Sequence, residues 1–133
     1  MERTQERKKI VIPYTPRVLQ AKLHNEMDRF NVVVCHRRFG KTVFAINHLI
    51  KSCIADLRDN KKAPRYAYLS PLFKQSKIVA WDELKRLLYD FPDVKFNEAE
   101  LRADFMGARI QLYGADNPDT LRGIYLDGVI LDE

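Results

Sequence analysis

The most constraining feature of the sequence is a basic, glycine-containing stretch between an apolar run, Val32–Val34, and a helical pattern. Its residues are Cys35, His36, Arg37, Arg38, Phe39, Gly40, Lys41 and Thr42. Gly-Lys-Thr between a strand and a helix is the context of a phosphate-binding loop, in which backbone N–H groups and the helix dipole hold an anion. We therefore expect this stretch to bind a nucleotide, with Lys41 on the β- and γ-phosphates and the Thr42 hydroxyl on Mg²⁺.

One position departs from the strict phosphate-loop pattern, because Cys35 stands where the first glycine is usual. Gly40, Lys41 and Thr42 keep the required spacing. The alternative interpretation is an ordinary turn between a strand and a helix. The apolar run before the stretch and the helical pattern after it favour the nucleotide site.

A second candidate feature closes the chain, where the apolar run Gly128–Leu131 is followed by Asp132 and Glu133. A continuous apolar run is typical of a strand inside a parallel sheet, and open α/β sheets bind ligands at the carboxyl ends of their strands. We expect Asp132 to hold Mg²⁺ and Glu133 to act as general base on the attacking water. Alone, the pair would indicate solvated acids, but the phosphate loop favours catalysis.

Length and composition indicate one globular domain without a membrane span. The sequence has 133 residues, and 23 Lys and Arg against 18 Asp and Glu give a net charge of +5, which suits a polyanionic partner or an ordinary solvated surface. No apolar run approaches the roughly 20 residues of a transmembrane helix, and the charged leader at 1–13 lacks the apolar centre of a signal peptide. Two cysteines are too few for a disulfide framework and fit a reducing cytoplasm.

Periodicity predicts an α/β fold with a largely parallel sheet, flanking helices and a β-hairpin. Helices are expected over about 15–29, with Thr15 as cap, and over 43–57 and 75–89. Strands are expected at 31–35, 66–70 and 129–132, and a hairpin joins 101–105 to 108–112. We expect Trp81 to pack in the core. The three histidines have no ligand spacing and are expected to be surface or structural residues: His24, His36 and His48.

Three segments together resemble the large terminase subunit of tailed bacteriophages and prophages. They are 36–42, the polar stretch 114–123 and the acidic strand 127–133. Within the second, Asn-Pro-Asp-Thr-Leu-Arg-Gly at 117–123 is the most specific, and the family tolerates an arginine-rich loop without its first glycine. By this resemblance, 14–133 is the N-terminal part of a P-loop ATPase domain of the ASCE type.

The resemblance also implies partners and residue roles. It implies an ATP-driven motor that moves double-stranded DNA into a procapsid, working as a ring with a portal protein and a small terminase subunit in the bacterial host cytoplasm. Gln20 would contact adenine, and Arg37 or Arg38 would sense phosphate charge, which suits a guanidinium. Arg122 would act as an arginine finger toward a neighbouring subunit, with DNA contact or a loop salt bridge as alternatives.

Two other functions fit the same motifs: a superfamily 2 helicase-like ATPase, and a non-catalytic nucleotide- or DNA-binding remnant. The family's C-terminal ATPase segments and nuclease domain do not occur in the sequence up to Glu133. We therefore expect endonuclease activity only in that missing domain. We also expect this chain alone to be poorly soluble or self-associating, and to hydrolyse ATP negligibly.

Overall fold

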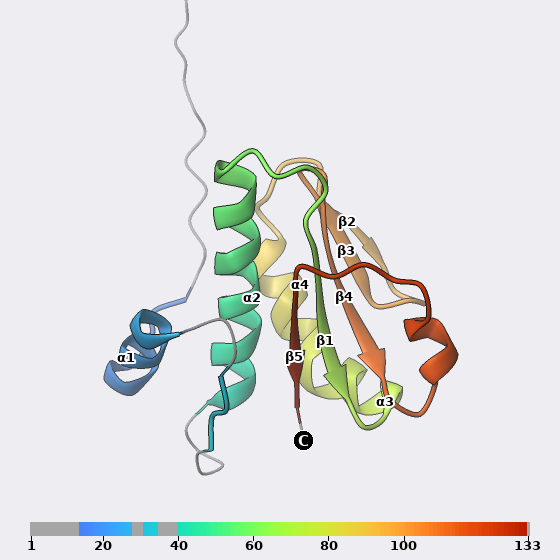
Figure 1. The fold of residues 1–133 in the computed structure, drawn as a ribbon, viewed down its shortest axis with the longest axis horizontal. Coiled ribbons are helices and arrows are strands. Elements are labelled where there is room, and N and C mark those ends of the chain that lie inside the picture. Colours follow the sequence, from blue (N-terminus) through green and yellow to red (C-terminus); the bar gives the residue numbers. More distant parts are fainter. Residues whose placement is uncertain (1–13, 28–30, 35–39, 133) are drawn as a thin grey trace, which may run out of the picture.

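The computed structural model describes residues 14–27, 31–34 and 40–132, which form a five-stranded sheet with α2 and α4 packed on one face (Figure 1). The strands are β1 (Arg65–Ser70), β2 (Lys95–Asn97), β3 (Arg102–Phe105), β4 (Ala108–Gly114) and β5 (Gly128–Leu131). The helices are α1 (Val18–Glu26), α2 (Lys41–Arg58), α3 (Phe73–Ser76), the π-helical η2 (Lys77–Trp81), α4 (Asp82–Leu88) and the 3₁₀ turn η3 (Pro118–Leu121).

The strand order is β2-β3-β4-β1-β5, and β1 pairs in parallel with both β4 and β5. The parallel centre follows from the connections, because a helical crossover separates β1 from β4 and allows both strands to point the same way. β5 lies at one edge of the described sheet, with Val129 47% and Leu131 70% exposed. The predicted α/β class is confirmed. The last apolar run, expected to be a strand of a parallel sheet, pairs in parallel with β1 and lies at the edge of the described sheet.

The antiparallel part of the sheet is the predicted hairpin between β3 and β4. Its two turn residues, Met106 and Gly107, have φ values of 53° and 84°. Two successive positive φ angles are what a two-residue hairpin turn requires to match the strand twist. The short strand β2 adds to β3 on the outer side and was not predicted.

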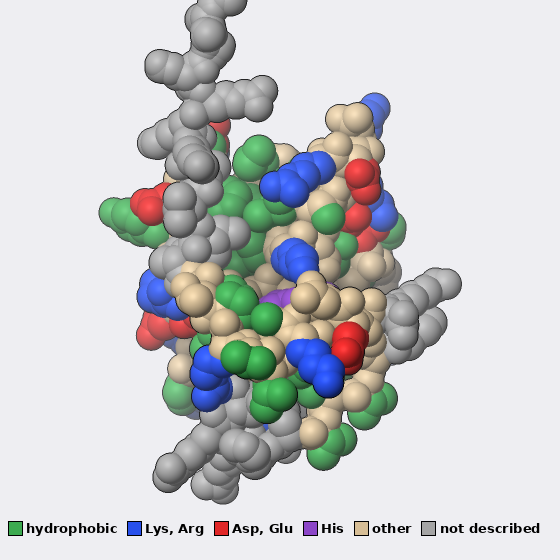
Figure 2. Space-filling view, turned by 90° about the vertical axis from the view of Figure 1, so that its left-hand side faces the viewer, with side chains coloured by type: hydrophobic (Ala, Val, Ile, Leu, Met, Phe, Trp, Pro, Cys, Tyr) green, Lys and Arg blue, Asp and Glu red, His purple; other side chains and the backbone are tan. Residues whose placement is uncertain are grey.

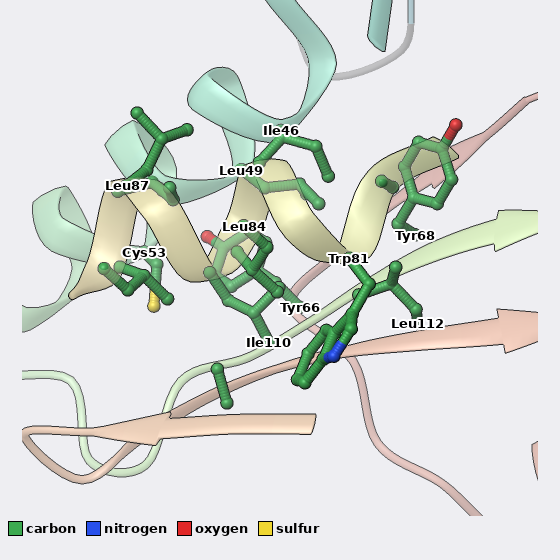
Figure 3. Close-up of a cluster of buried hydrophobic side chains, with 14 of the residues drawn as sticks. Ile46, Leu49, Cys53, Tyr66, Tyr68, Trp81, Leu84, Leu87, Ile110 and Leu112 are labelled. Carbon is green, nitrogen blue, oxygen red and sulfur yellow. The ribbon is translucent and has the colours of Figure 1, made fainter. Parts of the chain in front are cut away.

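The core lies between the sheet and the helices α2 and α4 (Figure 3). From α2, Ile46 and Ile50 are fully buried, as the predicted stripe requires. Trp81 is 1% exposed, and its Nε1 donates a hydrogen bond of 2.7 Å to Glu98 Oε1, so the predicted packing role is confirmed. Burying an aromatic side chain of this size removes much apolar surface from water, which stabilises the helix–sheet contact.

The N-terminal part of the chain differs from the predictions. Residues 31–34 form no strand, and Val32 and Val34 are each 92% exposed. Apolar, β-branched residues favour a strand only where a partner supplies hydrogen bonds, and β1 already has β4 and β5 on its two sides. Helix α1 begins at Val18 after an N-cap at Arg17, so the predicted cap at Thr15 is two residues too early.

Candidate functional site

Helix α2 and the parallel strands bring the two halves of the predicted site to one end of the molecule (Figure 1). Lys41 and Thr42 are the first residues of α2, and Asp132 directly follows β5. The amino end of α2 and the carboxyl ends of β1 and β5 lie at this same end. A helix amino terminus carries unpaired N–H groups and the positive end of the helix dipole, which favours phosphate there.

The carboxylate of Asp132 is held by the neighbouring strand β1. Its backbone N–H donates to Leu69 O at 2.9 Å, which extends the parallel ladder by one residue beyond β5. The Tyr68 hydroxyl donates a hydrogen bond to Asp132 Oδ2. Because Tyr68 is only 1% exposed, its packing fixes the position of this hydroxyl. The role of Tyr68 could not be predicted, since it depends on strand register.

Gly40 precedes α2 in a left-handed conformation, with φ at 85°. A Cβ at this position would lie 2.8 Å from Arg17 Nη2 and 2.8 Å from Gln20 Nε2. The positive φ angle favours glycine, and a Cβ here would also displace the ends of these two side chains. The sequence pattern predicted this glycine from phosphate binding, and the structure adds a contact with α1 as a second reason.

Gln20 is the side chain that joins α1 to the start of α2. Its Nε2 donates to Gly40 O at 3.2 Å, and its Oε1 accepts from Arg17 N at 2.9 Å. It is 4% exposed, whereas the apolar Leu19 beside it on α1 is 61% exposed. The alternative of a solvated glutamine is thus wrong, and Gln20 lies beside the predicted phosphate loop. Contact with adenine stays a prediction.

Two histidines form a second contact between α1 and α2. His24 and His48 stack with ring centroids 5.1 Å apart, and their Nδ1 atoms are 2.9 Å apart. On its other side, His24 Nε2 lies 2.9 Å from the Tyr14 hydroxyl. Figure 2 views the molecule from the side on which α1 and α2 lie in Figure 1, and it shows histidine surface (purple) near the centre of that side, with Lys and Arg side chains around it. The expected structural role is confirmed for these two residues.

Burial and nearby cations keep this histidine pair unprotonated. Burial, then the neighbouring His48 and Lys51, lower the pKa of His24 to about 4. Burial and then Lys51 also lower the pKa of His48. One ring must donate and the other accept for their hydrogen bond to form, so a second proton would break it.

Arg122 lies after η3, away from the predicted nucleotide site. Its side chain is 85% exposed, and its Nε is 3.5 Å from Asp119 Oδ1. The segment that carries it contacts β4 and lies on the opposite side of the view from α2 (Figure 1). An exposed guanidinium with one weak, solvated ion pair is available to another molecule. The structure does not bring Arg122 to this chain's own Lys41.

Six of the predicted site residues lie outside the described residues: Cys35, His36, Arg37, Arg38, Phe39 and Glu133. Of the predicted metal ligands, Thr42 and Asp132 supply hydroxyl and carboxylate oxygens, which are the donors Mg²⁺ prefers. Among the described residues, no three His, Cys, Asp or Glu side chains form a metal-holding cluster. The two oxygen donors of Thr42 and Asp132 fit Mg²⁺, which keeps water and substrate phosphate in its coordination shell.

No protein-family model and no curated protein matches the sequence. Among solved structures, the ATPase domain of the large terminase of Thermus phage P74-26 is similar, with a TM-score of 0.73 and 25% identity over 92% of this chain and 55% of that chain. An arginine-to-alanine variant of that domain has a TM-score of 0.73 and 24% sequence identity to this chain. The large terminase of the thermophilic bacteriophage D6E has a TM-score of 0.56 and 23% sequence identity, and the match covers 72% of this chain and 25% of that chain.

The fold is therefore that of the ATPase domains of phage large terminases, and the resemblance predicted from the sequence is confirmed. The chain spans about half of the length of the P74-26 ATPase domain, 55%. No described helix is long and apolar enough to cross a membrane.

Proposed function

We propose that residues 14–133 are the nucleotide-binding part of a phage or prophage terminase large subunit, whose ATP hydrolysis drives double-stranded DNA into a procapsid. The proposal rests on a fold like that of the terminase ATPase domain in which the start of α2, with Lys41 and Thr42, and the end of β5, before Asp132, lie at the same end. In the whole protein, a portal protein, a small terminase subunit and further copies in a ring are the partners, and the host cytoplasm is the location. The charged segment 1–13 is a leader to this domain.

Each residue has one task in this proposal. Lys41 binds the β- and γ-phosphates, and residues 35–40 surround the phosphates with backbone N–H groups. Thr42 and Asp132 would hold Mg²⁺, which when bound neutralises developing phosphate charge. Glu133 accepts a proton from the attacking water, and Arg38 or Arg37 stabilises the phosphate oxygens.

Positioning residues support this arrangement. Tyr68 holds one oxygen of Asp132, which leaves the other oxygen for Mg²⁺ or its water. Gln20 joins α1 to Gly40 by a hydrogen bond. Adenine bound against α1 would therefore also help to position the phosphate loop. Arg122 is exposed, and as an arginine finger it would act on the nucleotide of a neighbouring subunit.

The test is DNA-stimulated ATP hydrolysis by the complete protein, compared between the wild type and Lys41→Ala. The variant removes a charge-assisted hydrogen bond to phosphate and should reduce turnover by at least about 10²-fold. Lys51→Ala, on the same helix but ten positions further along, is the control and should keep the wild-type rate. Equal rates in all three proteins would overturn the proposed nucleotide site.

A further inference from the structure

A cavity of about 210 Å³ lies on the face of the sheet that α2 and α4 leave open. One wall is formed by outward side chains of β1 and β4, and the other by the segment 124–126, which passes across these strands toward β5 (Figure 1). Its volume is more than ten times the ~15 Å³ that one water requires. Four of its lining residues carry polar or charged groups that a ligand could use: Arg65, Arg109, Gln111 and Tyr113.

Two arginines from neighbouring strands line this cavity. Arg65 and Arg109 are direct partners in the parallel register of β1 and β4. Like charges opposite each other destabilise a sheet unless an anion compensates them. Arg109 Nε donates to Asp104 Oδ1 at 2.7 Å. Within the described part of the chain, Arg65 has no ion pair, and its Nη1 donates only to backbone carbonyl groups.

The surrounding charges leave this face positive. Asp104 is shared, because Arg102 Nε also lies 3.2 Å from its other oxygen, and Arg102 pairs with Glu100 at 2.6 Å. Among the described side chains of this face, two carboxylates therefore meet three guanidiniums, counting Arg65 and Arg109. The Asp127 carboxylate beside the segment 124–126 is already paired with Lys61 at 2.5 Å. These five described groups leave one positive charge, and Lys95, the register partner of Asp104 on β2, adds a further positive charge to this face.

The Tyr113 hydroxyl adds a neutral polar group to the cavity. Tyr113 is 8% exposed, and among the described residues nothing hydrogen-bonds to its hydroxyl. Burial raises the pKa of Tyr113, so this hydroxyl stays a neutral donor. Among the described residues, the Tyr113 hydroxyl is not one of the buried polar atoms that lack a partner, so it reaches solvent and can donate to an acceptor bound in the cavity.

We propose that this cavity binds a phosphate group, held by the Arg65 and Arg109 guanidiniums and the Tyr113 hydroxyl. Guanidinium forks match phosphate oxygens, and nitrogens of both arginines remain without hydrogen bonds in the described structure. Arg65 and Arg109 lie at the amino ends of their strands, opposite the end that carries Lys41 and Asp132. The proposal is therefore independent of the nucleotide site. The phosphate is either part of a nucleic-acid backbone or free phosphate.

The experiment uses the full chain in two titrations. The first adds inorganic phosphate at constant ionic strength and follows backbone amide signals of β1 and β4 by NMR. The second adds a short fluorescent DNA duplex and follows anisotropy as a function of salt. The variants are Arg65→Gln with Arg109→Gln, and Tyr113→Phe. The matched control, Lys51→Gln with Lys62→Gln, removes two charges outside the cavity.

For the wild type and the control, we expect saturable binding in at least one titration. The double arginine variant should bind at least tenfold more weakly, and Tyr113→Phe severalfold more weakly with unchanged thermal stability. If DNA is the source, the slope of log affinity against log salt should also fall by about 0.9 for each phosphate that the variant no longer neutralises. Saturation by phosphate with DNA binding unaffected assigns the site to free phosphate.

Equal affinities in the arginine variant and the control would overturn the proposal, as would a wild type that saturates with neither ligand. If the arginine variant fails to fold, the Tyr113→Phe variant tests the proposal, because it retains the aromatic ring. Wild-type affinity in Tyr113→Phe would then exclude the site. The phosphate-dependent shifts of the Arg65 and Arg109 amide signals should also appear in Lys41→Ala, which separates failure here from failure of the nucleotide site.

Discussion

Replacing Tyr68 by Phe tests whether β1 positions the predicted metal ligand. The change removes the hydroxyl that donates to Asp132 Oδ2 and keeps the buried ring, so no cavity forms. A hydrogen bond to an ionised group contributes about 1.5–3 kcal/mol. Since Asp132 is half-buried and water can replace the hydroxyl, we expect a loss of about 1.5 kcal/mol in the free energy of unfolding.

The same change should weaken Mg²⁺ binding more specifically than it weakens the fold. Removing a residue that orients a metal ligand typically lowers metal affinity by about 10–100-fold. We expect the Mg²⁺ concentration needed for half-maximal ATP binding to rise about tenfold. The assay is calorimetric titration of ATP into protein at a series of Mg²⁺ concentrations, beside urea denaturation of the same samples.

Tyr66→Phe is the matched control. Tyr66 lies on the same strand and face, is 7% exposed, and donates to Asp56 Oδ2 at 2.6 Å, away from the site. It should lose similar stability and keep the wild-type Mg²⁺ dependence. The reasoning would be refuted if the two variants shifted the Mg²⁺ dependence equally, or if neither did.

Two further predictions concern the acids and the histidine pair. In the complete protein, Asp132→Asn should weaken the Mg²⁺ dependence, whereas Glu133→Gln should keep ATP bound and slow hydrolysis by about 10²; identical behaviour would contradict the separate roles. The contact between α1 and α2 should be fully stable above about pH 6.5 and weaken as the pH falls toward about 4, because the pKa values of His24 and His48 are lowered from that of an unfolded histidine. Hydrogen exchange of α1 amides across this pH range measures the stability of the contact. If the pH dependence of exchange persists in His24→Phe, the histidine pair is not the cause of that dependence.

Local patterns sufficed for much of the fold. Helix α2 carries a continuous apolar stripe, and the hairpin carries alternation on both sides of Met106-Gly107, so both could be predicted without tertiary information. Strand β2 could not, because three residues at a sheet edge have too little burial to leave a pattern. The strand predicted at the run Val32–Val34 is absent from the described structure. Hydrophobicity favours a strand, but it does not show whether a neighbouring strand is available to pair with it.

In the candidate site, the sequence predicts those residues that belong to a motif with fixed spacing along the chain. Lys41, Thr42 and Asp132 follow from such spacing, and the structure places them at one end of the fold. The hydrogen bond from Tyr68 to Asp132 depends on which strand lies beside β5 and on its register. The cavity beside Arg65 also depends on register, because β4 is distant in sequence.

Binding of ATP to this chain tests the central claim most directly. Calorimetric titration of a non-hydrolysable ATP analogue with Mg²⁺ should show binding to the wild type and to Lys51→Ala. Lys41→Ala should bind at least tenfold more weakly, because the start of α2 then lacks its charged group for phosphate. Equal affinity in the Lys41 and Lys51 variants, or binding that does not depend on Mg²⁺, would contradict the phosphate-loop account.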